Sequence, residues 1–240
     1  MVSGAGAVGH NAIILAGGRS SRLGGTPKAL LESSGRTLLA VALQAAAGAR
    51  SCAVAGPPEL SGAVEAAGVP ALLVREDPPF SGPAAAVAAA WTALMKRDQE
   101  AGTPQPEWTL VLACDMPFIS RAVEVLLAEA GSSADANSFK DGSRNAPLQS
   151  RSLLCIDESG RPQPLAALYR TAALGTAVAG FDRPGGLENL SMKRLLARVQ
   201  WKDVAVPPHS TADVDTWEDA GRWSVKPGIN RGPDDAAALN

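Results

Sequence analysis

The sequence predicts an α/β fold in which helices cover both faces of a mostly parallel β-sheet. Short apolar, β-branched runs alternate along the chain with longer segments of helical periodicity, which is typical of parallel sheets. The chain has 240 residues, 46% hydrophobic and 19% charged, which is sufficient for a substantial core. We expect a flexible N-terminus over 1–10, one functional domain over 11–224 and a disordered tail over 225–240.

Six apolar runs are predicted to be strands. They are Asn11–Ala16, Ser51–Gly56, Ala71–Arg75, Thr109–Ala113, Pro164–Arg170 and Val199–Val206. Three groups of residues each share one helical face: Val87, Ala90, Trp91 and Leu94; Val123, Leu126, Leu127 and Ala130; Met192, Leu195, Leu196 and Val199. Ser120 is the expected N-cap of the second helix and Gly131 its expected C′ residue. The polar stretch Ser132–Arg161 predicts a long loop, as a lid, an insertion or a disordered segment.

Composition excludes several classes of protein. The net charge of −2 gives no basic field for nucleic acid or an anionic membrane, and no uncharged stretch suits a membrane span. Two histidines, His10 and His209, are too few for a His-rich metal site. The three cysteines form no CxxC pair and indicate reduced thiols, and the start lacks a basic secretory region, so we expect a cytoplasmic protein.

One glycine motif at the N-terminus is misplaced for its usual role. Gly4–Gly9 matches GxGxxG, the pattern of dinucleotide-binding loops. That pattern requires a strand before it and a helix after it, whereas here a strand follows. The motif is therefore expected to be a flexible segment, which argues against a dinucleotide-dependent oxidoreductase.

A second glycine-rich loop follows the first predicted strand. Leu15–Lys28 reads LAGGRSSRLGGTPK and holds four glycines, two arginines, two serines and a lysine. Backbone N–H groups of such loops form anion nests, and Arg22 and Lys28 add fixed positive charge. The loop is not a Walker A motif, because no GK[ST] occurs. Its place at the carboxyl end of a strand favours phosphate binding over a mobile surface loop.

This pattern, LAGG-x-S-x-R-x-G…PK, resembles the sugar-nucleotidyltransferase-like superfamily, and within it the molybdenum cofactor guanylyltransferases. The resemblance covers about 11–223. Three further segments fit the family's D…GPLAG, CDMP and QPL-x-ALY elements: Glu76–Pro83, Leu112–Pro117 and Gln163–Tyr169. The resemblance implies a three-layer α/β/α, Rossmann-like fold of the nucleotide-diphospho-sugar transferase type. Its N-terminal half would bind the nucleotide and its C-terminal half molybdopterin.

The activity that the resemblance implies is transfer of GMP from GTP to the phosphate of molybdopterin, with release of pyrophosphate and with Mg²⁺ as cofactor. The implied catalytic residues are Lys28, Arg22 and Asp115. The implied nucleotide-binding residues are Leu15, Ala16, Gly17, Gly18, Lys28, Asp77, Gly82 and Asp115. The implied partners are GTP, molybdopterin and an acceptor molybdoenzyme.

The implied metal ligands are Asp115 and Asp215. A carboxylate at the tip of a buried strand requires a positive partner, which makes Asp115 suitable for Mg²⁺. The segment 213–219 resembles the family's N-x-NTPEDL motif but carries Asp213 and Asp215 in place of two asparagines. Each of Asp77, Asp115 and Asp215 has a simpler alternative as a helix cap.

Two other features bear on the substrates. Gly56 ends the second strand where the guanylyltransferases often carry an asparagine that touches the nucleotide. In the half of the chain matched to the pterin site, the residues of suitable chemistry are Tyr169, Arg170, Lys193 and Arg194.

Two other functions stay open. The chain could transfer CMP to molybdopterin, or a nucleotide to a sugar phosphate or phospholactate, on the same fold. It could also be a non-catalytic, nucleotide-binding partner of a molybdoenzyme. The LAGG and CDMP motifs favour the guanylyl branch, since the cytidylyl enzymes more typically carry LAAG and GDMP.

Overall fold

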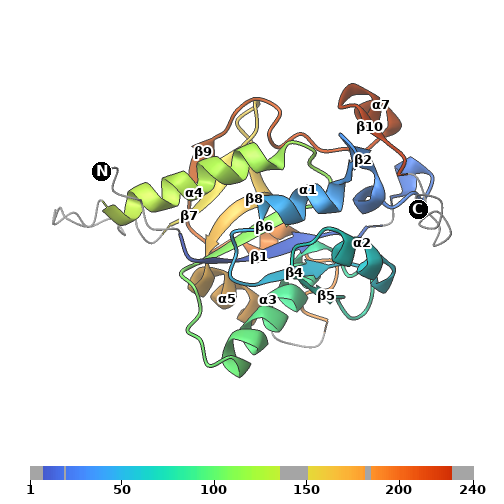
Figure 1. Ribbon diagram of the computed structural model, residues 1–240. Coiled ribbons are helices and arrows are strands. Elements are labelled where there is room, and N and C mark those ends of the chain that lie inside the picture. The colour runs from blue at the N-terminus through green and yellow to red at the C-terminus, as the bar shows by residue number, and fades with distance from the viewer. Residues whose placement is uncertain (1–7, 19, 136–150, 182–184, 229–240) are drawn as a thin grey trace, which may run out of the picture.

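The computed structural model describes residues 8–18, 20–135, 151–181 and 185–228. Its centre is a seven-stranded sheet of order β5-β4-β1-β6-β8-β7-β9 (Figure 1). The strands are β1 His10–Leu15, β4 Cys52–Ala55, β5 Leu72–Val74, β6 Trp108–Ala113, β7 Ser152–Ile156, β8 Pro162–Arg170 and β9 Trp201–Ala205. Within this sheet β8 runs antiparallel to both of its neighbours, and the other pairs are parallel. The predicted mostly parallel α/β fold is confirmed.

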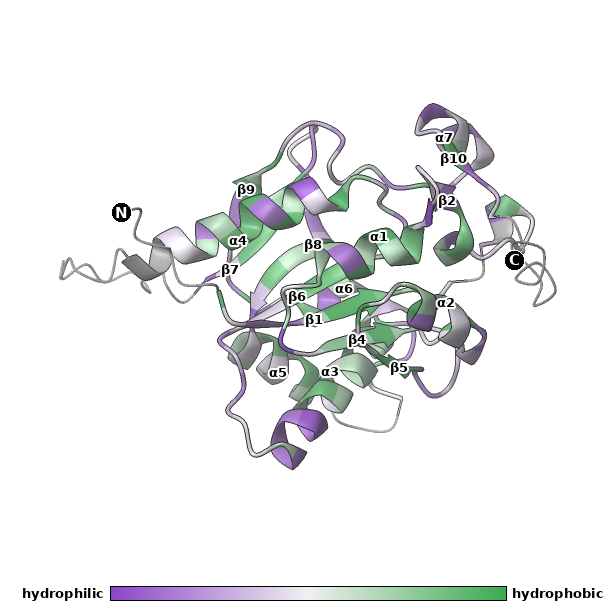
Figure 2. Ribbon diagram, viewed as in Figure 1, coloured by the Kyte–Doolittle hydropathy of each residue, from purple (hydrophilic) through white to green (hydrophobic). Residues whose placement is uncertain are grey.

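Helices cover both faces of this sheet (Figure 1). One face carries α1 Leu38–Ala45, α2 Ser61–Ala66 and α4 Ile119–Asp135, and the other carries α3 Pro83–Glu100, α5 Thr171–Ala179 and α6 Met192–Leu195. Alternate residues of β1 supply the two cores, because successive side chains of a strand point to opposite faces. The central strands and α1 are largely hydrophobic, whereas the outer end of α3 is hydrophilic (Figure 2).

A second, small sheet joins a segment of the N-terminal part of the chain to one of the C-terminal part. It has the order β10-β2-β3, with β2 Glu32–Ser33, β3 Arg36–Thr37 and β10 Val225–Lys226, and α7 Trp217–Arg222 precedes β10. Its core contains Leu23, Leu31, Leu38, Val214, Ala220 and Val225. The sheet therefore holds the C-terminal segment against the residues that follow the glycine-rich loop.

The structure corrects several sequence-based expectations. The stretch Ser132–Arg161 was expected to be a loop, but it contains β7, whose short apolar run lies between polar segments. Residues 136–150 of that stretch lie outside the described part. Ser120 and Gly131 are wrong as caps, because α4 begins one residue before Ser120 and extends past Gly131 to Asp135.

Cys52, Cys114 and Cys155 are free and buried. No helix in the described ranges is long and apolar enough to cross a membrane. Residues 4–7 of the Gly4–Gly9 motif lie outside the described residues.

Candidate active site

The predicted site residues lie at one edge of the main sheet, namely the edge formed by the carboxyl ends of its parallel strands. The parallel strands β1, β4, β5 and β6 all end there, and the loops that follow β1, β5 and β6 carry Lys28, Asp77 and Asp115. The Cys114 N–H donates to the carbonyl of Leu15 at 3.0 Å, which places the start of the glycine-rich loop beside the segment that bears Asp115. This edge is where open α/β sheets bind ligands.

Lys28 is the centre of a charged cluster. Its Nζ donates to Asp115 Oδ2 at 2.8 Å and also to Asp215 Oδ1. The Arg22 guanidinium lies 3.7 Å from Asp215 Oδ2. The structure thus brings together Arg22, Lys28, Asp115 and Asp215, which are separated by up to 193 positions in the sequence.

The two carboxylates keep Lys28 protonated. Burial by itself would lower the pKa of Lys28, but the charges and hydrogen bonds of Asp115 and Asp215 outweigh it and raise the pKa above its usual value. Asp213, nearby, has a raised pKa because it is partly desolvated and faces the negative charges of Asp115 and Asp215. With Asp213 included, two cations therefore lie among three carboxyl groups.

Local backbone structure fixes the position of Lys28. Ser20 accepts hydrogen bonds from the Leu23 and Gly25 N–H groups through its carbonyl, and its Oγ accepts from the Lys28 N–H at 3.4 Å. Gly25 has φ +83°, a left-handed conformation that side chains disfavour. Lys28 then begins the 3₁₀ turn Lys28–Leu30, immediately after Pro27.

The segment that bears Asp215 is fixed by the start of α7. Thr216 caps this helix in a capping box with Asp219, whose carboxylate also accepts the Asp215 N–H at 3.3 Å. The alternative that Asp215 caps the helix is therefore wrong. The Val214 N–H donates to the Asp115 carbonyl at 3.0 Å, which joins the two carboxylate-bearing segments directly.

Asp115 and Cys114 have different roles at the end of β6. The Asp115 carboxylate contacts Lys28, and the next helix begins at Ile119, so a capping role for Asp115 is not what its contacts indicate. Cys114 is buried, and burial strongly raises the pKa of its thiol. This agrees with Cys114 as a core residue rather than a nucleophile.

The loop after β5 presents Asp77 to solvent at the same edge. No hydrogen bond or ion pair joins Asp77 to the described residues of the Lys28 cluster. With β4 between β5 and β1, the two places are separated by about 10 Å of sheet. Sequence reasoning missed Glu76, which is buried and accepts the Phe80 N–H at 2.9 Å, so that it organises this loop.

Gly82 ends the loop and is the N-cap of α3. Its φ is +92°, and a Cβ there would lie 3.7 Å from the Asn189 Cα, so the loop passes close to a segment of the C-terminal half. The Asn189 N–H donates to the Ser81 carbonyl at 2.7 Å. The N–H groups of the first turn of α3 favour an anion at this place.

Leu60 fills the space beside Gly56. A Cβ at position 56 would lie 3.0 Å from Leu60 Cδ1 and 3.4 Å from the Ala16 Cβ. A larger side chain, such as the asparagine of the guanylyltransferases, would require these neighbours to shift. The glycine at position 56 is thus matched to the close packing of Leu60 and Ala16 around it.

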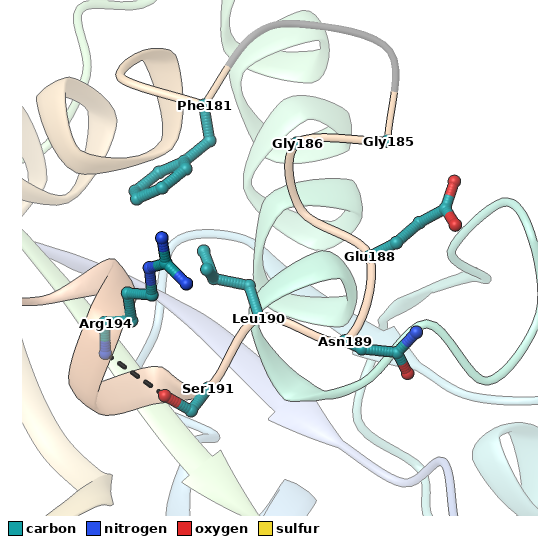
Figure 3. A pocket seen from close by; sticks show the side chains of 8 residues that line it. All are labelled: Phe181, Gly185, Gly186, Glu188, Asn189, Leu190, Ser191 and Arg194. Atoms are coloured by element: carbon teal, nitrogen blue, oxygen red, sulfur yellow. Dashed lines mark hydrogen bonds between the residues drawn. The ribbon is translucent and has the colours of Figure 1, made fainter.

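A pocket of about 470 Å³ adjoins the Gly82 loop (Figure 3). Its lining residues are Phe181, Gly185, Gly186, Glu188, Asn189, Leu190, Ser191 and Arg194. The Arg194 side chain extends between Phe181 and Leu190. The side chains of Glu188 and Asn189 point away from Arg194, on the other side of the segment that bears them. A cation beside an aromatic ring suits a planar or anionic ligand.

Two of the predicted pterin-side residues do not lie in this pocket. Tyr169 is fully buried and donates to the Pro164 carbonyl at 2.8 Å. Arg170 pairs with Glu107 and lies over the Trp108 ring, at the opposite edge of the sheet. Both side chains are thus structural, and Arg194 is the member of the predicted set that lines the pocket.

The charged cluster can hold a divalent cation together with a nucleotide. Asp115 and Asp215 already converge on one positive group, and Mg²⁺ typically takes one or two carboxylates plus phosphate oxygens. No group of three or more metal-ligating side chains occurs within the described ranges. The donor set therefore fits Mg²⁺ bound with a phosphate ligand, and not a site made of protein ligands alone.

Comparisons with known proteins bear on the family and the fold. Residues 12–200 match the family model described as the MobA-like NTP transferase domain. No curated protein matches the chain.

Solved structures share the fold. Molybdopterin-guanine dinucleotide biosynthesis protein A from Archaeoglobus fulgidus is 17% identical with a TM-score of 0.59, over 89% of this chain and 96% of that one. The protein Rv0371c from Mycobacterium tuberculosis is 21% identical with a TM-score of 0.58, over 90% and 97%. The 2-C-methyl-D-erythritol 4-phosphate cytidylyltransferase from Thermus thermophilus is 21% identical with a TM-score of 0.54, over 88% and 96%.

Proposed function

The chain belongs to the MobA-like NTP transferase family, and from that premise we propose that it transfers GMP from GTP to the phosphate of molybdopterin and releases pyrophosphate. The observation that carries the proposal is the convergence of Arg22, Lys28, Asp115 and Asp215 beside the glycine-rich loop. Cations and metal-binding carboxylates at one point are what nucleotidyl transfer requires, since most of its catalysis is positioning and charge stabilisation.

The chemistry needs no covalent intermediate. An oxygen of the molybdopterin phosphate attacks the α-phosphorus of GTP in line, a new P–O bond forms, and the bond to the β-phosphate oxygen breaks. Lys28 stabilises charge on the transferring phosphate, and Arg22 with the loop 17–25 holds the departing pyrophosphate. Because the attacking phosphate is ionised at pH 7, no general base is required, which accords with the scarcity of histidine.

Mg²⁺ is part of this proposal. Asp115 and Asp215 would hold it, and it would supply charge neutralisation on the phosphate oxygens. Lys28 bridges these carboxylates, so its ammonium group would turn from them toward the phosphates when the substrates bind.

The two substrates would lie on either side of the cluster. The nucleoside would extend from the ends of β1 and β4 toward Asp77, whose carboxylate can accept hydrogen bonds from guanine N–H groups. Molybdopterin would use the pocket lined by Phe181 and Arg194, which adjoins Gly82. The same arrangement suits transfer of CMP, and Gly56, which lacks the guanylyltransferases' asparagine, keeps that alternative open.

Nucleotide-dependent thermal stabilisation tests the base preference. We expect GTP with Mg²⁺ to raise the melting temperature more than CTP, ATP or UTP. A ligand at 100 times its Kd stabilises the folded protein by about 2.7 kcal/mol, so the nucleotide with the lowest Kd gives the largest shift. The variant Asp77→Asn should lose the preference for GTP while retaining stabilisation by triphosphates. Larger stabilisation by CTP would reassign the protein to the cytidylyl activity, and stabilisation by none would contradict nucleotide binding at this edge.

A further inference from the structure

Trp223 connects the two segments that carry the active-site carboxylates. It follows α7, and its ring meets Phe118 edge-to-face at a centroid distance of 5.7 Å. It also meets the His209 ring, at a centroid distance of 5.0 Å and an interplanar angle of 44°. Phe118 lies three residues after Asp115, and His209 begins the segment that leads to Asp215.

Other contacts anchor the same tryptophan. It packs against the small core that contains Leu23 of the glycine-rich loop and Val214, the residue between Asp213 and Asp215. His209 is itself held, because Glu158 accepts its backbone N–H at 3.0 Å and contacts its Nδ1 at 2.9 Å. One indole ring thus touches or adjoins all three segments that form the charged cluster.

We propose that Trp223 is a positioning residue that fixes the separation of the Asp115 and Asp215 segments, and so presets the site for the cation that both carboxylates bind. This role rests on the proposed nucleotidyl transfer for its consequence, but not for its geometry. Aromatic rings pack with defined edge and face preferences, so three neighbouring rings orient the segments that bear them. A backbone hydrogen bond from Val214 to Asp115 and the flexible Lys28 side chain also join the segments.

Hydrogen exchange of the nucleotide-free protein tests the geometry. In Trp223→Ala we expect amides of 114–119 and 206–216 to exchange at least about tenfold faster than in the wild type, while the main sheet is unchanged. Trp223→Phe, which keeps an aromatic ring, should restore most of the protection. Trp201→Ala is the matched control, because Trp201 is also partly exposed but lies on β9.

Mn²⁺ affinity, measured by electron paramagnetic resonance with GTP present, tests the consequence. Residues that orient metal ligands typically contribute about 10–100-fold to metal affinity, so Trp223→Ala should bind Mn²⁺ about tenfold more weakly. Trp223→Phe and Trp201→Ala should stay near the wild type. Wild-type exchange rates and wild-type Mn²⁺ affinity in Trp223→Ala would overturn the proposal.

Two further variants keep the test decisive if Trp223→Ala does not fold. Phe118→Leu should loosen mainly 114–119, and His209→Ala mainly 206–216, because each removes one side of the ring contact. Equal loosening of both segments by either variant, or of neither, would contradict the proposal. Faster exchange in Trp223→Ala, combined with a wild-type protein that binds no Mn²⁺, would support the positioning role and reject the proposed metal role.

Discussion

At the scale of single residues, Lys28 has a role that depends on its neighbours. It lies between Asp115 and Asp215 and has a raised pKa, so it offers a permanent cation to an incoming phosphate. Its candidacy was predictable, because a lysine that ends a glycine-rich loop after a strand indicates phosphate binding. Its bridge between two distant carboxylates was not predictable, since it depends on tertiary structure.

Replacing Lys28 should abolish most of the activity. We expect Lys28→Met to lower kcat/KM by about 100-fold or more, because the transferring phosphate loses a preorganised cation. Lys28→Arg should also have low activity, since a planar guanidinium cannot reproduce the contacts of a compact ammonium group. Lys202→Met, at a lysine paired with Glu129 on the surface, is the matched control and should keep wild-type kinetics.

Asp213 should lower stability at neutral pH. Its pKa is raised in the folded protein by desolvation and by Asp115 and Asp215, so folding disfavours its ionised form. The penalty is absent below the pKa of the unfolded chain and grows as the pH rises through it. Asp213→Asn should therefore raise the melting temperature by about 1–2 °C at pH 7 and not at pH 3. A stabilisation of equal size at both pH values would contradict this explanation.

At the scale of elements, runs long enough to show a period were predictable. The predicted strand Asn11–Ala16 corresponds to β1, and the face of Val87, Ala90 and Leu94 is the buried side of α3. β7 was missed because its apolar run lies in a polar region, and β2, β3 and β10 because two-residue strands have no period. The contacts among the rings of Phe118, His209 and Trp223 could not be predicted, since these residues come from separate segments.

A buried carboxylate near the end of α3 connects this helix to the edge of the main sheet that lies opposite the Lys28 cluster. Asp98 accepts from Asn11 Nδ2 and from Arg50 Nη2, both at 3.0 Å. Asp98→Asn should lower the free energy of unfolding by about 1–2 kcal/mol in urea titrations, because a charged hydrogen-bond pair is lost. Its kinetics should match the wild type, since Asp98 contacts Asn11 at the start of β1, whereas the Lys28 cluster lies beyond the end of that strand. A large loss of activity in a folded Asp98→Asn protein would contradict this separation of stability and function.

At the scale of the whole molecule, the topology gathers the site from both ends of the chain. The parallel strands bring the glycine-rich loop and the end of β6 together, and the small sheet returns the C-terminal segment to them. The first of these was predictable from strand–helix alternation. The return of the C-terminal segment through the small sheet was not predictable, and this return places Asp215 beside Lys28.

Pyrophosphate release tests the central claim most directly. The purified protein would receive molybdopterin, Mg²⁺ and each nucleoside triphosphate in turn, with Asp115→Ala alongside. We predict release with GTP and molybdopterin together, and loss of about 100-fold or more of it in a folded Asp115→Ala variant. If no nucleoside triphosphate supports release with molybdopterin, or if Asp115→Ala releases pyrophosphate as fast as the wild type, nucleotidyl transfer at this cluster is contradicted.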